Sequence, residues 1–278
     1  MSPFGEVGGG PGRRLLVRPE RRMAVLAAGL LDPGRWEAAL SAEGGGRGRA
    51  GRLHLEDGVV WGKRMRRGGA LAPLWRDRFL GRERLMRNVM VAEEAVARGV
   101  PTPAPVALLT EEGPPGLFRA WLATEWVEGA RDLASLLRDD VVGPVELREA
   151  LRVVRVLHDA GIEHPDLNLG NLLLRRSSSG PQAFVVDLDR ARLHGQGLSP
   201  ARRQAALRRL ERSHAKLFGV PGPFGGDGSA WYEGYAGDDP ALSAYLTAGR
   251  PAGRLRLVMH RTLRGRKGGQ WARGGSRK

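Results

Sequence analysis

The chain has no cysteine, only four lysines and no long hydrophobic run among its 278 residues. The lack of cysteine excludes a disulfide framework, a thiolate zinc site and a cysteine nucleophile. The most apolar stretch near the start, residues 23–31, is nine residues long, whereas a membrane-spanning helix needs about 20. It also begins too far into the chain to be a typical signal peptide. We therefore expect a cytoplasmic protein.

The charge is strongly unbalanced, with 45 basic and 30 acidic residues giving a formal net charge of +15. At 41% hydrophobic residues, the chain is not a disordered polycation, and such a charge is typical of nucleic-acid-binding or membrane-surface proteins. However, 41 of the basic residues are arginine and glycine is equally abundant, a composition typical of GC-rich coding. No acidic residue follows Asp239, so +10 of the +15 lies in the last 39 residues.

The order of local signals predicts a two-lobed α+β fold. A strong turn signal, Asp57-Gly58, separates two apolar runs and predicts a hairpin. A helix is expected over 82–98 and a strand over 120–127, followed by helices over 132–138, 144–159 and 200–217, with a Gly-rich stretch after the last of them. Strands thus come first and helices later, which favours two lobes with a cleft between them.

These signals give the expected domain boundaries. Residues 1–30 form a disordered N-terminal segment, and 31–128 form a β-rich, nucleotide-binding N-terminal lobe. Residues 129–245 form a mainly helical C-terminal lobe that carries catalysis and acceptor binding, and 246–278 form a basic tail. A chain of this length can bury the cores of two such lobes.

The sharpest motif is His164-Pro-Asp-Leu-Asn-Leu-Gly-Asn171, which precedes an apolar hairpin and then Val185-Val-Asp-Leu-Asp189. Phosphoryl transfer needs a carboxylate near the attacking hydroxyl and oxygen ligands for Mg²⁺. Asp166 can supply the base, and Asn171 and Asp187 can supply the ligands. This order is typical of the protein-kinase-like superfamily. The alternative is that all three are ordinary loop and strand-end residues without a catalytic role. It requires the features found earlier in the chain, described next, to be coincidental.

Those upstream features occur in the expected order. The run Gly44–Gly51, with Gly46 and Gly48, can approach phosphates closely. Lys63, a rare lysine in an arginine-rich chain, is expected to contact phosphates; the alternative is a solvated strand-end lysine. The backbone at Glu125 and Val127 lies where a linker between lobes would meet an adenine ring.

Six segments together resemble the lipopolysaccharide-core sugar kinases, within the protein-kinase-like superfamily. They are Gly46-Arg-Gly-Arg49, Arg66-Arg-Gly-Gly69, Gly99-Val-Pro-Thr-Pro103, Gly129-Ala-Arg-Asp-Leu133, His164-Pro-Asp-Leu-Asn168 and Val186-Asp-Leu-Asp-Arg190. The resemblance runs from about Trp36 to Phe218 and is strongest to kinases of 3-deoxy-D-manno-octulosonic acid (Kdo). It implies ATP-dependent phosphorylation of a Kdo hydroxyl on a lipid A–core precursor, with Mg²⁺, by a peripheral enzyme on the cytoplasmic face of the inner membrane.

The resemblance also implies roles for single residues. Asp166 would be the general base, and Asn171 and Asp187 the Mg²⁺ ligands. Lys63, Gly46, Gly48, Glu125 and Val127 would contact the nucleotide. Asp189, in the place of the usual metal-loop glycine, and the following Arg190 would hold substrate or metal. His164 is expected to be structural, bonding backbone near the metal-binding strand.

The chain also departs from the kinase pattern. Asn88 stands where a helix glutamate usually pairs with the lysine, and Glu83, Glu93 or Glu94 are the alternatives on the same helix. Pro165 replaces the arginine before the catalytic aspartate, and no long activation segment follows Asp187, so control by loop phosphorylation is not expected.

Several alternatives stay open at this point. The acceptor could be heptose or an antibiotic-like small molecule, and the chain could also be a basic nucleic-acid-binding pseudokinase, which the intact set Asp166, Asn171 and Asp187 disfavours. Arginines between the metal loop and residue 212 suit phosphate and carboxylate groups of a glycolipid. They are Arg190, Arg192, Arg202, Arg203, Arg208, Arg209 and Arg212. In so arginine-rich a chain, this basic helix could equally be a solvated surface.

Overall fold

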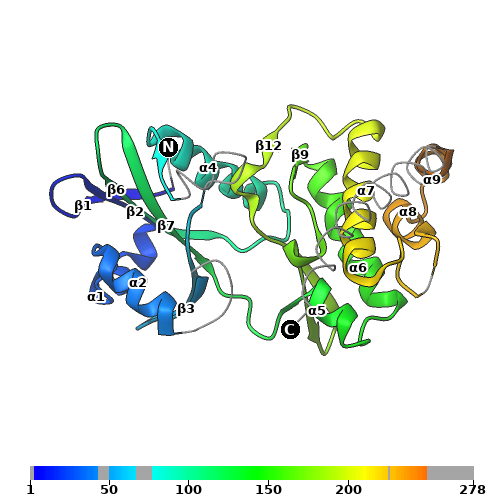
Figure 1. Cartoon of the computed structure of the whole chain (residues 1–278), viewed down its shortest axis with the longest axis horizontal. Helices are drawn as coiled ribbons and strands as arrows, with labels where there is room; N and C mark the ends of the chain where they lie inside the picture. Colours follow the sequence, from blue (N-terminus) through cyan, green and yellow to red (C-terminus); the bar gives the residue numbers. More distant parts are fainter. Residues whose placement is uncertain (1–2, 43–49, 67–76, 225, 249–278) are drawn as a thin grey trace, which may run out of the picture.

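The computed structural model describes residues 3–42, 50–66, 77–224 and 226–248. Two lobes lie side by side, one built on a large antiparallel sheet and the other mainly helical (Figure 1). The predicted two-lobed α+β fold is therefore confirmed. Within the described ranges, no helix is both long and apolar enough to cross a bilayer.

The first lobe is a seven-stranded sheet in the order β1-β2-β6-β7-β4-β3, with β5 paired to β7. Its strands are β1 (Gly5–Gly8), β2 (Arg13–Val17), β3 (Ala50–Leu55), β4 (Gly58–Arg64), β5 (Phe79–Leu80), β6 (Pro105–Glu112) and β7 (Leu117–Glu125). Its helices are η1 (Pro19–Arg21), α1 (Arg22–Ala27), α2 (Pro33–Ala42) and α4 (Glu83–Ala97). The predicted hairpin at Asp57-Gly58 and the helix expected over 82–98 are both confirmed.

The sheet is covered on both faces, and residue alternation along its strands assigns each face. Successive strand side chains point to opposite faces. Trp121 accordingly packs in one cluster with Trp36 of α2, while the adjacent Leu122 packs in another with Leu85 of α4. The two helical layers therefore rest on opposite faces, and α4 lies on the face that Leu122 presents.

The prediction that residues 1–30 are disordered is wrong for residues 3–30. Strand β1 pairs with β2, and β2 joins the sheet beside β6. Leu15, Val17 and Val25 are fully buried in the core. The Gly/Pro-rich composition marks the tight turn between the two strands, where Gly10 and Gly12 have positive φ, a conformation that glycine adopts without strain. The first lobe therefore begins near Phe4 and not at residue 31.

The second lobe consists of helices packed on small sheets. Its helices are α5 (Leu133–Arg138), α6 (Pro144–Asp159), η2 (Leu169–Asn171), η3 (Leu188–Arg190), α7 (Pro200–Phe218), α8 (Ser229–Ala236) and α9 (Pro240–Ala248). Its strands are β8 (Arg131–Asp132), β9 (Ile162–Glu163), β10 (Leu172–Ser177), β11 (Gly180–Val185) and β12 (Arg192–Leu193). They pair in the order β11-β10-β8 and as β12 with β9.

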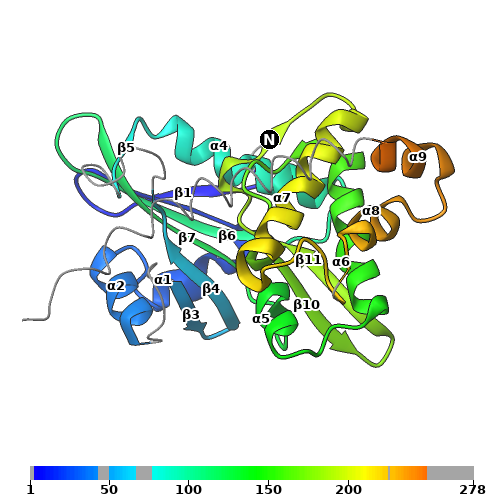
Figure 2. The same ribbon diagram turned by 45° about the vertical axis from the view of Figure 1, so that its right-hand side comes forward.

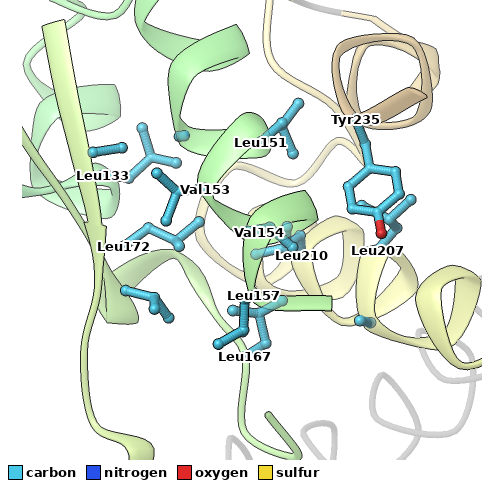
Figure 3. Packing of buried hydrophobic residues seen from close by; sticks show 14 of the residues in the cluster. Leu133, Leu151, Val153, Val154, Leu157, Leu167, Leu172, Leu207, Leu210 and Tyr235 are labelled. Atoms are coloured by element: carbon cyan, nitrogen blue, oxygen red, sulfur yellow. The ribbon is translucent and has the colours of Figure 1, made fainter. Parts of the chain in front are cut away.

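Helix α6 is the central element of this lobe, in contact with β11 and α8 (Figure 2). Its apolar side chains at helical spacing, Leu147, Leu151, Val154 and Leu157, are all buried as the sequence pattern predicts. Figure 3 shows several of them packed with Leu210 and residues of the neighbouring elements. The helices α8 and α9 were not expected: Gly234 interrupts the short apolar pattern of α8, and α9 is only nine residues long.

Helix α4 belongs to the first lobe but its C-terminal end is fixed to the second. Ala95 and Val100 pack in the second lobe's core. Arg98 Nη1 donates a 2.6 Å hydrogen bond to Ala160 O, and Val185 N donates one of 2.9 Å to Pro101 O. The chain itself passes from the first lobe to the second after Glu125. The contacts at the end of α4 and this linker hold the lobes together around the space between them.

A buried polar chain joins α6, α7 and α8 inside the second lobe. Arg203 Nη1 donates to Tyr235 Oη at 3.1 Å, and Tyr235 Oη lies 2.9 Å from His158 Nδ1. His158 is fully buried. This burial, reinforced by the charge of Arg203, lowers the pKa of His158 to about 3, so the ring is neutral in the native protein.

Replacing Leu15 with Ala tests the N-terminal strand. Leu15 is fully buried, so we expect the free energy of unfolding to fall by about 2–5 kcal/mol. Urea denaturation measures it, with Met23→Ala as the control because Met23 is 77% exposed and such changes stay within about 0.5 kcal/mol. Equal stability of Leu15→Ala and wild type would mean that the strand is not part of the fold.

The buried histidine predicts an acid-sensitive stability. An unfolded histidine takes up a proton near pH 6.5, while native His158 does so only near pH 3. Its contribution is therefore complete above pH 6.5 and declines towards pH 3, at about 1.4 kcal/mol per pH unit. We expect urea unfolding between pH 4.5 and 7 to show a free energy of unfolding that depends less steeply on pH in His158→Asn than in wild type. The difference in slope should correspond to about one proton. An unchanged slope would contradict the neutral, buried ring.

Candidate functional site

A cavity of about 610 Å³ lies between the lobes. Its walls come from β4, α4, β7, the linker after β7, α5, η2 and the segment around η3. Most of its lining is apolar, with a few charged and amide side chains at one end. They include Lys63, Asn88, Asn171, Asp187 and Asp189. Volume and lining suit a small-molecule ligand.

Lys63 reaches the cavity because of its register in the sheet. It lies opposite Leu122 on β7, and directly opposed residues share a face, so Lys63 is on the α4 side. Its Nζ lies 2.7 Å from Asp187 Oδ1 and 2.9 Å from Asp189 Oδ2. Burial disfavours the charged ammonium, but attraction to Asp189 and Asp187 outweighs it and raises the pKa of Lys63. The side chain is thus a fixed cation within the cavity wall.

Asp187 is positioned by the strand before it and by an unusual backbone conformation. It lies two residues after the end of β11 and is the N-cap residue of η3, with φ 64° and ψ 51°. Aspartate tolerates this left-handed conformation better than most residues, at some cost in strain. Partial burial opposes its ionisation, yet the Lys63 ammonium beside it holds the pKa of Asp187 below its ordinary value.

The loop that carries Asp166 is folded around the backbone oxygen of that residue. The Nδ2 atoms of Asn168 and Asn171 donate to Asp166 O at 2.8 Å and 2.9 Å. The side chain of Asp166 is exposed, and no hydrogen bond or ion pair to its carboxylate is found among the described residues. The two asparagines therefore fix the backbone and leave the carboxylate open to solvent.

His164 joins this loop to the strand before Asp187. Its Nε2 lies 3.1 Å from Val186 O, and burial lowers the pKa of the ring, so a neutral Nε2–H donates to that carbonyl. The expectation that His164 is structural is confirmed by this bond. The loop is entered through Gly161, where a Cβ would lie 2.6 Å and 2.7 Å from the carbonyl oxygens of Gln196 and His194.

None of the glutamates expected on α4 pairs with Lys63 in the part of the chain described. Glu93 pairs with Arg18, and Glu94 pairs with Arg98 at 2.7 Å. Asn88 lines the cavity, as expected for that helix position. The ion pairs of the lysine come instead from Asp187 and Asp189 on the opposite lobe.

The linker residues Glu125 and Val127 both line the cavity. The backbone N of Glu125 donates to Ala104 O at 2.8 Å, and the backbone O of Val127 accepts from Ala130 N at 3.2 Å. The Glu125 carboxylate lies 3.3 Å from Arg21, so the N-terminal segment fixes the linker.

Two tryptophans at the linker were missed by sequence reasoning. Trp61 of β4 and Trp126 stack with ring centroids 5.5 Å apart and an angle of 24° between the planes, and both line the cavity. Trp61 lies two residues before Lys63 and Trp126 lies between the two linker residues. Their closeness in sequence to predicted site residues was the available signal. It indicates a shared site only when β4 is known to pair with β7.

Four predicted residues lie outside the cavity lining or outside the described residues. Asp166 is exposed on its loop and is not part of the cavity lining. Gly46 and Gly48 fall in the segment 43–49, which the described ranges leave out. Arg190 is exposed at the end of η3, and its charge contributes to the lowered pKa of Asp187.

The donor atoms at the charged end of the cavity fit a magnesium ion. Because Asn171 Nδ2 donates to Asp166 O, its Oδ1 is free for a ligand role, and Asp187 and Asp189 add carboxylate oxygens. Hard oxygen donors of this kind suit Mg²⁺, and both carboxylates already bind a cationic group, the Lys63 ammonium. Across the described ranges, no three His, Asp or Glu side chains gather as a metal site, which agrees with the way that Mg²⁺ is usually held, by one or two carboxylates together with other oxygen ligands.

Comparison with known proteins gives a consistent result. A model of the family described as "Lipopolysaccharide kinase (Kdo/WaaP) family" matches residues 35–221. The 3-deoxy-D-manno-octulosonic acid kinase of Xanthomonas campestris pv. campestris (strain B100) is 34% identical over 227 residues, 79% of this chain and 86% of the relative. The enzyme of the same name from Haemophilus influenzae (strain PittEE) is 31% identical over 158 residues, 55% of this chain. The match spans 64% of that relative's length, slightly less than two thirds.

A solved structure described as "WaaP in complex with acyl carrier protein" has the same fold. It is 22% identical in sequence with a TM-score of 0.50, and the superposition covers 86% of this chain and 99% of that one.

The two carboxylates around Lys63 are expected to contribute unequally to stability. The Asp189 side chain is 22% exposed and that of Asp187 is 45% exposed. Asp189→Asn should therefore lower the free energy of unfolding by about 1–3 kcal/mol, and Asp187→Asn by less, because solvent screens its ion pair. Denaturant unfolding of the two matched variants measures the difference. An equal or larger loss in Asp187→Asn would show that Asp189 is not the main anchor.

Proposed function

Because the chain belongs to the lipopolysaccharide kinase (Kdo/WaaP) family, we propose that it transfers the γ-phosphoryl group of ATP to a hydroxyl of a Kdo sugar on a lipid A–core precursor. The observation that carries the proposal is the convergence of Lys63, Asn171 and Asp187 on one end of a single cavity. The exposed Asp166 carboxylate lies on the loop beside them.

In this proposal each of these residues has a separate task. Asp166 accepts the proton of the acceptor hydroxyl, and its exposure leaves room for a sugar to approach. Lys63 contacts the phosphates as a point charge. Asp189, 2.9 Å from Lys63 Nζ, positions the lysine in the way that a helix glutamate does in the kinase pattern.

Mg²⁺ and ATP are part of the same proposal. Asn171 and Asp187 would hold the metal, which supplies charge neutralisation at the phosphate oxygens. An ionised carboxylate has lone pairs enough for two partners, so Asp187 can bind Lys63 and a metal together. The base would lie in the apolar part of the cavity, between the linker at Glu125 and Val127 and the opposite wall at Leu173.

The acceptor is assigned to Kdo because the relatives that match most of this chain are named for that sugar acid. A heptose acceptor is the nearest rival, since acceptor choice depends on surface residues outside the shared motif. An antibiotic-type acceptor would use the same catalytic residues and is separated from both by a panel of acceptors.

The location follows from the acceptor in this proposal. A lipid-linked sugar lies at a membrane surface, so the enzyme would work peripherally at the cytoplasmic face of the inner membrane. The basic tail, residues 250–278, falls outside the described ranges. Each basic residue near an anionic surface would add about 1 kcal/mol of attraction.

A nucleic-acid-binding pseudokinase is the alternative from another class. Two features favour it: the net charge of +15, and Asn88 in the place of the helix glutamate that usually pairs with the lysine. A scaffold without activity has no need to keep Asn171 and Asp187 at a cavity that also contains Lys63, with Asp166 on the loop that leads to Asn171. We therefore place nucleic acid outside the function of this chain.

The proposal is tested by phosphoryl transfer from radiolabelled Mg–ATP to Kdo-lipid A, with heptose-containing and aminoglycoside acceptors alongside. Wild type should label Kdo-lipid A, and Asp166→Asn should lower the rate about 10²- to 10⁴-fold. Asp238→Asn is the matched control, because Asp238 is exposed on the second lobe and is not part of the cavity lining.

A melting experiment separates nucleotide binding from transfer. Mg–ATP at about 100 times its Kd should stabilise wild type by about 2.7 kcal/mol, seen as a rise of several degrees in Tm. Asp166→Asn should keep this rise, while Asp187→Asn should lose it. The kinase assignment is abandoned if wild type neither labels any acceptor nor responds to Mg–ATP.

A further inference from the structure

Several arginines of α7 have partners within the protein, so fewer of them are available to bind a ligand. Arg202 Nη1 donates to Glu163 Oε2 at 2.6 Å, and Arg203 pairs with Asp159. Arg208 donates to the Gln204 side chain at 3.0 Å. These arginines have partners inside the protein, so they are not the ones held ready for a ligand.

Arg209 differs from them in both position and partners. Helical residues seven and four apart lie on one face, so Arg209 lies on the same stripe as Arg202 before it and Ser213 after it. Arg202 contacts Glu163, and Ser213 Oγ accepts a 3.3 Å hydrogen bond from Leu169 N. Both ends of the stripe therefore contact the segment from 163 to 169.

The residue between these two contacts must face the middle of that segment, which contains Asp166. The positive charge of Arg209 acts on this segment, because together with burial it lowers the pKa of His164. Arg209 is half-buried, and among the described residues it forms no ion pair or hydrogen bond through its side chain. A guanidinium with five donors and no acceptor thus faces the loop of the proposed base.

A second guanidinium reinforces the positive charge at this place. Arg212 is exposed on the neighbouring stripe of α7. Its pKa is lowered, first by partial burial and then by the charge of Arg209. Two like charges held near each other are mutually destabilising, and an anion bound between them would relieve the repulsion.

We propose that Arg209 binds the carboxylate of the acceptor sugar acid while a hydroxyl of the same sugar lies at Asp166. The proposal rests on the function proposed above and names how its acceptor is recognised. A sugar acid carries its carboxylate and hydroxyls on one small molecule, so a hydroxyl at Asp166 brings the carboxylate to the neighbours of that loop. A guanidinium recognises a carboxylate by two parallel hydrogen bonds.

Equilibrium binding of free Kdo, measured by calorimetry without nucleotide, tests the proposal independently of transfer. Arg209→Gln should weaken binding about 10- to 100-fold. The affinity of Arg209→Lys should lie between those of wild type and Arg209→Gln. Arg148→Gln is the control for lost charge, because Arg148 is exposed on α6 and does not line the cavity between the lobes. Melting temperatures of all variants without ligand show that each is folded.

Chemical variants of the sugar identify the group that is bound. The methyl ester of Kdo should bind wild type about as weakly as Kdo binds Arg209→Gln, and esterification should cost the variant nothing further. The proposal is overturned if Arg209→Gln binds Kdo as wild type does, or if the ester weakens both proteins equally. Arginine-dependent binding without any transfer would retain this site and refute only the kinase activity.

Discussion

The structure of the site depends on one interaction, the attachment of the Lys63 ammonium to the carboxylates of Asp187 and Asp189. The lysine belongs to the sheet of the first lobe, and both aspartates belong to the second. Each ion pair therefore spans the cavity and sets the distance between its walls at the charged end. The register of β4 on β7 orients the lysine, and the left-handed backbone at Asp187 brings both carboxylates to it. A partly buried lysine needs such partners, because unpaired burial would cost far more than either single pair contributes.

Because Asp187 and Asp189 bind Lys63, the lysine does not need an ion-pair partner from α4. In the kinase pattern a glutamate of this helix makes the pair, which couples helix position to activity. Here Glu93 binds Arg18 of the N-terminal segment, and the helix end is attached to the second lobe through Arg98. The helix is thus fixed by contacts that do not involve the cavity. The segment between Asp187 and α7 is also short, so within the described residues neither of the two parts that protein kinases use for switching is found.

Sequence patterns predicted most of the fold and the central motif because these depend on local chemistry. The spacing of Asp166, Asn171 and Asp187 and the amphipathic pattern of α6 are readable along the chain. Other features arise only from long-range pairing. Asp189 becomes a partner of Lys63 through a contact across 126 residues, and the stack of Trp61 on Trp126 requires two strands to meet. The hairpin of β1 and β2 was missed because the Gly-rich composition of its turn is also typical of disordered segments.

The net charge of +15 also has a structural interpretation. Many arginines of the described residues are used internally, as Arg21 is at the linker and Arg203 is in the core of the second lobe. Their planar, multiply donating head groups can join several backbone and carboxylate oxygens at once, so arginine abundance here stabilises contacts between elements. A total charge therefore says little about a partner. What carries information is a guanidinium that faces a functional loop without an internal acceptor, since its desolvation is offset only when an anion arrives. By that criterion, and within the described residues, the basic surface that indicates a ligand is a small part of α7 next to the loop that carries Asp166.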